Sequence, residues 1–133
     1  MENERHGISI LAVEDDEAVR DMLGVMINRK FPDNPLYFAE NGKIGIELFK
    51  AYNPEIVITD IIMPVMDGVE MASTIKTIES DIKLIVITGY DYAAYHEKFS
   101  KMGANAFITK PIDIKKLFAA IEVCIAEINI NSQ

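Results

Sequence analysis

Cysteine is nearly absent from this chain of 133 residues, in which Cys124 is the single instance. One cysteine excludes a disulfide framework within the chain and a zinc site built from cysteines. Cys124 shares a helical spacing with Leu117, Ile121, Ile125 and Ile128. The pattern therefore predicts a buried, unreactive thiol rather than a redox sensor.

Long hydrophobic runs are also missing. Polar and charged residues from Glu2 to His6 occupy the place where the apolar core of a signal peptide would begin, and no span long enough to cross a membrane follows. We expect a cytoplasmic protein that does not enter the membrane. No low-complexity tract or glycine-serine linker interrupts the sequence.

Basic residues are in the minority, because 13 Lys and Arg stand against 21 Asp and Glu. The resulting net charge of -8, with a pI near 4.7, opposes attraction to phosphate backbones. Direct binding of nucleic acid is therefore not expected. The sequence also lacks a Walker phosphate loop and a dinucleotide-binding glycine fingerprint, which disfavours nucleotide enzymes.

Length and composition indicate one folded domain. The apolar share of 50% and the charged share of 26% are ordinary for a soluble globular protein. The chain is long enough for one core but too short for a second domain of typical size. We assign residues 1–7 to a flexible tail, residues 8–129 to the domain, and residues 130–133 to a tail or the start of a linker.

Five short apolar runs alternate with segments of helical periodicity, which predicts an α/β fold with a parallel sheet covered on both faces. The expected strands are Ile8–Val13, Leu36–Ala39, Ile56–Thr59, Leu84–Ile87 and Ala106–Thr109. Five helices are expected between and after these strands. The first contains Val19–Ile27, the second runs from Gly42 to Asn53, and the third begins after Gly68. The fourth contains Tyr95–Met102 and ends at Gly103, and the fifth runs from about Asp113 to about Asn129. On the third helix, Lys76 and Glu79 are expected to face water.

Chemically active side chains follow four of these strands. They are Glu14 and Asp15 after the first, Asp60 after the third, Thr88 after the fourth and Lys110 after the fifth. Ligands of open parallel sheets bind at the carboxyl ends of the strands, so these groups are expected to meet at one edge.

Three carboxylates at one edge need a counter-ion. Glu14, Asp15 and Asp60 would repel one another, so a cation is required to keep them ionised together at neutral pH. Ligand sets made only of oxygen favour Mg2+, Mn2+ or Ca2+ over zinc. We therefore expect an Mg2+ site in which Mn2+ or Ca2+ is able to substitute.

Four motifs, in this order, resemble the receiver domain of two-component response regulators of the chemotaxis-regulator-like kind. They are V-E-D-D-E from Val13, T-D-I-I-M-P-V-M-D-G from Thr59, I-T-G from Ile87 and T-K-P from Thr109. The resemblance extends from about Ile8 to about Ile128. It implies a flavodoxin-like doubly wound sheet of five parallel strands in the order 2-1-3-4-5, with five helices.

The resemblance also implies roles for the acidic residues. Asp60 would be the phosphoacceptor, attacking the phosphohistidine of a sensor histidine kinase or a phosphotransfer protein. Asp15, Asp60 and the backbone carbonyl of Ile62 would ligate Mg2+ directly. Glu14 would act on the metal mainly through water.

Phosphorylation in this family changes the surface formed by the fourth helix, the fifth strand and the fifth helix, which a downstream effector domain or protein then reads. Thr88 and Lys110 would bind the phosphoryl oxygens. The residue at the aromatic switch position of the fifth strand is Phe107. For Phe107, a switching role and a purely packing role both remain open.

Ile62 and Tyr90 stand two residues beyond Asp60 and Thr88, where the family places side chains beside the route of the hydrolytic water. An apolar wall and a ring at these places predict slow loss of the phosphoryl group. Alternatively, Tyr90 would orient that water.

Two rival functions remain. A pseudo-receiver would signal by contacts alone, without phosphorylation. A haloacid-dehalogenase-like hydrolase would need a second acid two residues after Asp60, where Ile62 stands. We expect no enzymatic activity beyond the chain's own phosphorylation and dephosphorylation.

Three remaining features carry weaker expectations. His6 in the tail and His96 on the fourth helix are expected to be solvated, and neither is a candidate metal ligand or phosphohistidine. Burial explains most of the last helix, whose exposed side would lead into a linker or support a homodimer.

Overall fold

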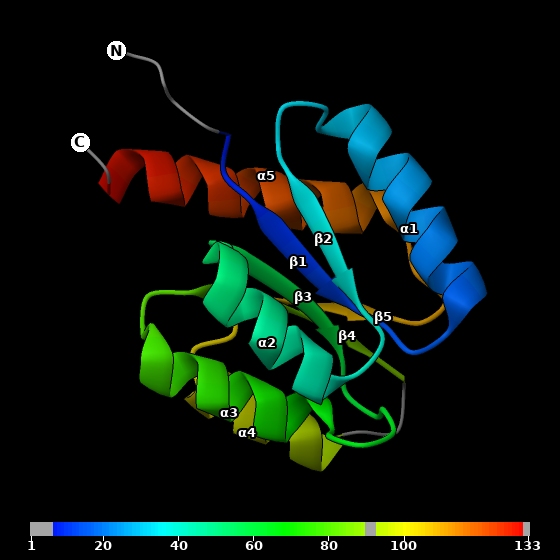
Figure 1. The fold of residues 1–133 in the computed structure, drawn as a ribbon, viewed down its shortest axis with the longest axis vertical. Helices are drawn as coiled ribbons and strands as arrows, with labels where there is room; N and C mark the ends of the chain where they lie inside the picture. Colours follow the sequence, from blue (N-terminus) through cyan, green and yellow to red (C-terminus); the bar gives the residue numbers. More distant parts are fainter. Residues whose placement is uncertain (1–6, 90–92, 132–133) are drawn as a thin grey trace.

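The computed structural model describes residues 7–89 and 93–131, along which strands and helices alternate (Figure 1). The strands are β1 (Ile10–Val13), β2 (Leu36–Ala39), β3 (Ile56–Asp60), β4 (Lys83–Thr88) and β5 (Ala106–Thr109). The helices are α1 (Glu17–Lys30), α2 (Gly42–Tyr52), α3 (Gly68–Ile78), α4 (Ala93–Lys101) and α5 (Ile114–Asn131). The prediction of an α/β fold is confirmed.

The five strands form one parallel sheet in the order β2-β1-β3-β4-β5. Near the carboxyl ends, Val13 of β1 is in register with Thr59 of β3, and Asp60 is in register with Ile87 of β4. Four neighbouring strands thus present their carboxyl ends at one edge, and the flavodoxin-like order expected from the resemblance is confirmed.

Helices cover both faces of this sheet, with α1 and α5 on one side and α2, α3 and α4 on the other (Figure 1). Successive side chains of a strand point to opposite faces. In β1, Leu11 packs in the core that includes Phe49 of α2, whereas Ile10 packs in the core that includes Leu117 of α5. Burial on both faces explains why the strands are apolar runs without alternation.

Short polar side chains begin the helices. Asp16, Asn41 and Asp67 each accept a hydrogen bond from a backbone N–H in the first turn of α1, α2 and α3. Asp113 accepts from the backbone N–H of Lys115, which confirms its predicted capping role. The helix that follows, α5, extends beyond the expected end near Asn129 to Asn131.

Two expectations about side-chain exposure have different outcomes. Cys124 is 1% exposed, which confirms the predicted burial. Because burial disfavours the charged thiolate, desolvation raises the pKa of the Cys124 thiol to about 11. The prediction that Lys76 faces water is only partly right. Its ammonium group donates to the carbonyl of Ile82 at 3.1 Å, and its stem is half-buried, because the chain after α3 folds back over it. Glu79 is exposed, as expected.

Candidate functional site

The first acidic residues of the site are held by the loop between β1 and α1. Arg20, one turn into α1, donates from Nη1 to the carbonyl oxygens of Glu14 at 2.9 Å and Asp15 at 3.2 Å. The backbone N–H of Asp16 donates to Oε2 of Glu14 at 3.1 Å. Both acidic residues therefore occupy defined positions directly after β1.

Asp60 is the last residue of β3 and is 5% exposed. Its Oδ1 accepts a hydrogen bond from the backbone N–H of Ile61 at 2.7 Å. The loop that follows returns to the strand, since the N–H of Gly68 donates to the carbonyl of Ile61 at 2.7 Å. A Cβ on residue 68 would collide with the carbonyl oxygen of Asp60, which explains the glycine at this place.

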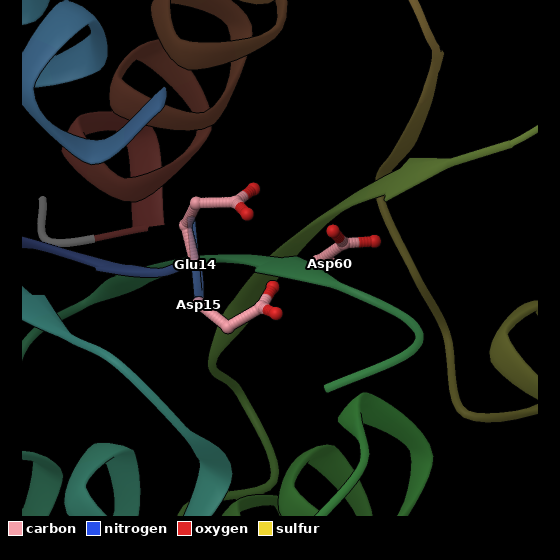
Figure 2. Close-up of side chains that lie close together, drawn as sticks. All are labelled: Glu14, Asp15 and Asp60. Atoms are coloured by element: carbon pink, nitrogen blue, oxygen red, sulfur yellow. The ribbon is translucent and has the colours of Figure 1, made fainter. Parts of the chain in front are cut away.

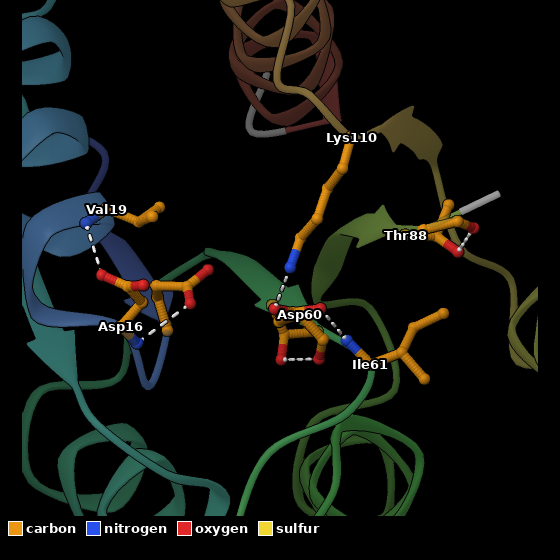
Figure 3. A network of polar contacts seen from close by, with 9 residues as sticks. Asp16, Val19, Asp60, Ile61, Thr88 and Lys110 are labelled. Carbon is orange, nitrogen blue, oxygen red and sulfur yellow. Dashed lines mark hydrogen bonds and ion pairs between the residues drawn. The ribbon is translucent and has the colours of Figure 1, made fainter.

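Lys110 supplies the positive charge of the site. From the end of β5 it reaches across to Asp60, where its Nζ lies 2.6 Å from Oδ2 (Figure 3). Burial alone would lower the pKa of Lys110. The hydrogen bond that Lys110 donates to Asp60 and the negative charges of Asp60, Glu14 and Asp15 outweigh that effect and raise the pKa above its usual value. Lys110 is therefore a permanent cation.

Glu14, Asp15 and Asp60 gather their carboxylates at the same edge (Figure 2). One oxygen of each lies within 4.8 Å of one oxygen of the others. Glu14 is 3% exposed, and within residues 7–89 and 93–131 no group donates to its Oε1. Desolvation, together with the charge of Asp60, raises the pKa of Glu14 to about 7 despite the hydrogen bond from Asp16. A buried oxygen without a donor, next to two other carboxylates, fits a cation site.

Two of the other predicted residues stand at the strand ends on the same edge of the sheet. Thr88 ends β4 and is 7% exposed, but its hydroxyl donates to the carbonyl of Gly89 at 2.9 Å (Figure 3). Ile62 follows the strand end and is 48% exposed.

Phe107 lies apart from the acidic residues, half-buried on β5 against the ring of His96. His96 is exposed, as expected, although one face of its ring stacks on Phe107. Tyr90 and His6 lie outside the described residues.

Sequence reasoning missed Arg20. Little in the sequence indicates the role of this residue, because an arginine between the apolar positions of a helix is normally expected to face solvent. Asp16, a preferred N-cap residue directly before the helical period, would have marked the start of α1 and thus placed Arg20 in the first turn, beside the loop carbonyls.

Comparison with known proteins decides the family. A family model described as the response regulator receiver domain matches residues 10–122. The chain belongs to this family. The match covers all five strands and every predicted site residue, so the resemblance expected from the four motifs is confirmed.

Similar receiver domains occur both as short proteins and as parts of longer ones. This receiver domain is 34% identical to the chemotaxis protein CheY of Halobacterium salinarum over 112 residues, which covers 84% of this chain and 92% of that protein. It is 28% identical to YesN, an uncharacterized transcriptional regulatory protein of Bacillus subtilis, over 90% of this chain but only 33% of that protein.

Solved structures with this fold include two close matches. The N-terminal domain of an uncharacterized protein from Wolinella succinogenes has a TM-score of 0.87 and 32% identity, covering 96% of this chain and 100% of that chain. A CheY-like receiver domain protein from Methanospirillum hungatei has a TM-score of 0.83 and 25% identity, covering 91% of this chain and 95% of that chain.

One structural finding bears on the membrane. None of the helices formed by the described residues is long and apolar enough to span a bilayer.

Proposed function

We propose that this receiver domain is a phosphorylation-controlled switch in which Asp60 takes a phosphoryl group from a phosphohistidine of a sensor histidine kinase or a phosphotransfer protein. One observation carries the proposal: the Asp60 carboxylate faces the Lys110 ammonium at 2.6 Å while two further carboxylates lie beside it. Such a site has a nucleophile, a cation and a set of metal ligands at one edge of the sheet.

The donor set fits Mg2+, with Mn2+ or Ca2+ able to substitute, because every candidate ligand atom, from carboxylate or backbone carbonyl, is an oxygen. Asp15, Asp60 and the backbone carbonyl of Ile62 would hold the ion directly, and Glu14 would hold it through water. When bound, the ion supplies positive charge that balances the carboxylates and the incoming phosphoryl oxygens.

The side chains of the chain itself supply nucleophilic attack and charge balance. The Oδ1 atom of Asp60 accepts from the N–H of Ile61, and Oδ2, which accepts from Lys110, is the oxygen assigned to attack phosphorus as Lys110 shifts away from it. A bond forms between Oδ2 and phosphorus as the bond from phosphorus to the imidazole nitrogen breaks. As this bond forms, the ammonium of Lys110 passes from Oδ2 to a phosphoryl oxygen, where it stabilises the charge of the transferring group.

The first conformational change on phosphorylation is a rotation of the Thr88 side chain. In the structure its hydroxyl donates to Gly89, so binding a phosphoryl oxygen requires this hydroxyl to turn toward Asp60. The phosphoryl group adds about 1.5 to 2 negative charges and three acceptor oxygens, and a hydrogen bond to one of these oxygens stabilises the rotated hydroxyl. The surface of α4, β5 and α5 would transmit the change to an effector domain or protein in the cytoplasm, without nucleic-acid binding by this chain.

The experiment is intact mass spectrometry after incubation with acetyl phosphate, with and without Mg2+. The parent chain is expected to gain one phosphoryl group only when Mg2+ is present, and Asp60→Asn is expected to gain none. Asp67→Asn is the matched control. It changes an acid of the same loop that only caps α3, and it should be phosphorylated like the parent. No adduct on the folded parent protein would favour the pseudo-receiver instead.

A further inference from the structure

One arginine holds the backbone of the loop that carries two of the candidate metal ligands. Nη1 of Arg20 donates to the carbonyl of Glu14 at 2.9 Å and to the carbonyl of Asp15 at 3.2 Å. The backbone N–H of Arg20 donates to the carbonyl of Asp16 at 2.9 Å. Every carbonyl between the end of β1 and the start of α1 is therefore bonded to the same residue.

Both ends of this loop are anchored. The N–H of Glu14 donates to the carbonyl of Ala39 on β2 at 3.0 Å, which attaches the loop to the sheet. The side chain of Asp16 accepts from the N–H of Val19 at 3.2 Å and so fixes the start of α1 (Figure 3). Arg20 thus acts from a rigid helix on a loop whose first residue is tied to a rigid sheet.

The guanidinium of Arg20 is used for shape rather than for charge pairing. Four acids lie within five residues of it in the sequence, namely Asp15, Asp16, Glu17 and Asp21. Within the part of the chain that the structure describes, however, the ion pairs are formed by lysines. A guanidinium that is surrounded by acids and still donates to backbone carbonyls orients the chain, because its fixed fork of donors imposes one geometry on its acceptors.

The carboxylate that depends most on this geometry is that of Asp15. The side chain is exposed, and no hydrogen bond or ion pair from the described residues holds its carboxylate. It nevertheless lies within 4.8 Å of carboxylate oxygens of Glu14 and Asp60 (Figure 2). Like charges at this separation repel, so the backbone must keep the Asp15 side chain at the site. The hydrogen bonds from Arg20 fix that backbone.

We propose that Arg20 is a positioning residue that gives the site its preference for Mg2+ over Ca2+. The proposal rests on the proposed function, since it requires the metal site at Glu14, Asp15 and Asp60. Mg2+ demands near-ideal octahedral geometry at about 2.0–2.1 Å, whereas Ca2+ accepts flexible arrangements at about 2.3–2.6 Å. A loop bonded at three successive carbonyls restricts the Asp15 carboxylate to one arrangement, and a restricted ligand favours the smaller, more demanding ion.

The charge of Arg20 and its hydrogen bonds affect metal affinity in opposite directions. A positive charge beside the site repels a cation, so removal of the charge alone would tighten the binding of both ions. Loss of a group that orients a ligand weakens metal binding instead, typically by about 10- to 100-fold. The sign of the change in affinity therefore separates the two roles.

Isothermal titration calorimetry of the unphosphorylated full chain, with Mg2+ and separately with Ca2+, tests the proposal. Arg20→Met keeps most of the apolar stem but removes the donors. It is expected to raise the Kd for Mg2+ about tenfold. The Kd for Ca2+ should rise clearly less, because Ca2+ tolerates a displaced ligand.

Arg20→Lys provides the conservative rescue, since it keeps the charge and places an ammonium donor on a shorter side chain. Its Kd for Mg2+ is expected to lie between those of the parent and Arg20→Met. An effect of charge alone would give a different order, with the tightest binding in Arg20→Met and equal binding in Arg20→Lys and the parent. Arg20→Lys also provides the comparison with the parent if Arg20→Met does not fold.

Arg29→Met is the matched control, because Arg29 is an exposed arginine in the last turn of α1. It should leave both dissociation constants unchanged, and circular dichroism in a metal chelator verifies that each variant is folded. Equal weakening for both ions, or Mg2+ binding in folded Arg20→Met as tight as in the parent, would overturn the proposal. A folded parent that binds neither ion would overturn the metal site as well, whereas a parent that binds Mg2+ leaves the proposed function standing.

Discussion

The imidazole of His96 on α4 lies flat against the ring of Phe107 on β5, with the ring centroids 3.9 Å apart and the ring planes inclined by 24°. This contact joins a helix and a strand of the surface that, in our proposal, changes on phosphorylation. Any rotation of Phe107 toward the sheet would separate the two rings.

The first prediction uses this contact as a reporter. The carbon-bound ring protons of His96 are shielded by Phe107, so phosphorylation is expected to shift their NMR signals downfield as the rings separate. The chain has two histidines, His6 and His96, which makes the assignment of their signals simple. If the His96 signals stay in place in a phosphorylated sample, Phe107 has a packing role only.

The second prediction concerns Lys110. Lys110→Met keeps most of the side-chain volume but removes the ammonium that faces Asp60. Phosphorylation by acetyl phosphate is expected to slow by about 100-fold, the usual cost of losing one group that stabilises developing charge. The measurement is the initial rate of adduct formation at fixed Mg2+. Lys116→Met, an exposed lysine of α5, is the control, and equal rates for the two variants would contradict the assigned role.

The third prediction concerns pH. The pKa of Glu14 is raised from 4.5 to about 7 in the folded protein, chiefly by desolvation. Between these values the folded state binds more protons than the unfolded state, so the free energy of unfolding falls as pH rises from about 4.5 to about 7. The loss attributable to Glu14 is on the order of 3 kcal/mol without metal.

Urea unfolding in a metal chelator at pH 5 and pH 8 measures this loss. Glu14→Gln is expected to be less sensitive to pH, so that its advantage over the parent grows between the two values. Added Mg2+ should restore much of the parent's stability at pH 8, because it pairs with the ionised carboxylates. Parallel behaviour of parent and variant would show that Glu14 does not titrate in this interval.

The fourth prediction concerns Val65 in the loop after Asp60. Val65 has φ of 72° although it is β-branched and 76% exposed, so it is strained without being held by packing. Val65→Asn is expected to stabilise the fold by about 1 kcal/mol, because asparagine tolerates the left-handed region. Val25→Asn, on the helical backbone of α1, should instead destabilise slightly. Thermal unfolding compares the two, and a lower Tm for Val65→Asn than for the parent would refute the strain.

The fifth prediction concerns the lifetime of the phosphorylated state. Ile62 is 48% exposed and follows Asp60 by two residues, where its apolar side chain is expected to hinder the hydrolytic water. Ile62→Asn should lose its phosphoryl group a few-fold faster than the parent, because an amide is able to bind that water. Decay of the adduct after removal of acetyl phosphate measures the rate, and an unchanged lifetime would exclude the barrier.

Much of the molecule follows from the sequence alone. Apolar runs and helical spacings are local patterns, so all five strands, all five helices and the acidic residues at the strand ends could be predicted within a few residues. The capping role of Asp113 and the burial of Cys124 were predictable for the same reason, since each depends on neighbours along the chain. Parallel strands carry their carboxyl ends to one edge, which already placed Asp60 near Lys110.

Tertiary structure alone decided how these groups meet. Lys110 and Asp60 are separated by 50 residues, and only the packed sheet brings their charged atoms to 2.6 Å. The pKa of Glu14 depends on how completely the fold removes water from it, and the hydrogen bonds of the Lys76 amine depend on the path of the chain after α3. The hydrophobic periodicity that predicts strands and helices depends on residues close together in the sequence. Distances between charges and the exclusion of water from a side chain arise only when distant segments pack together.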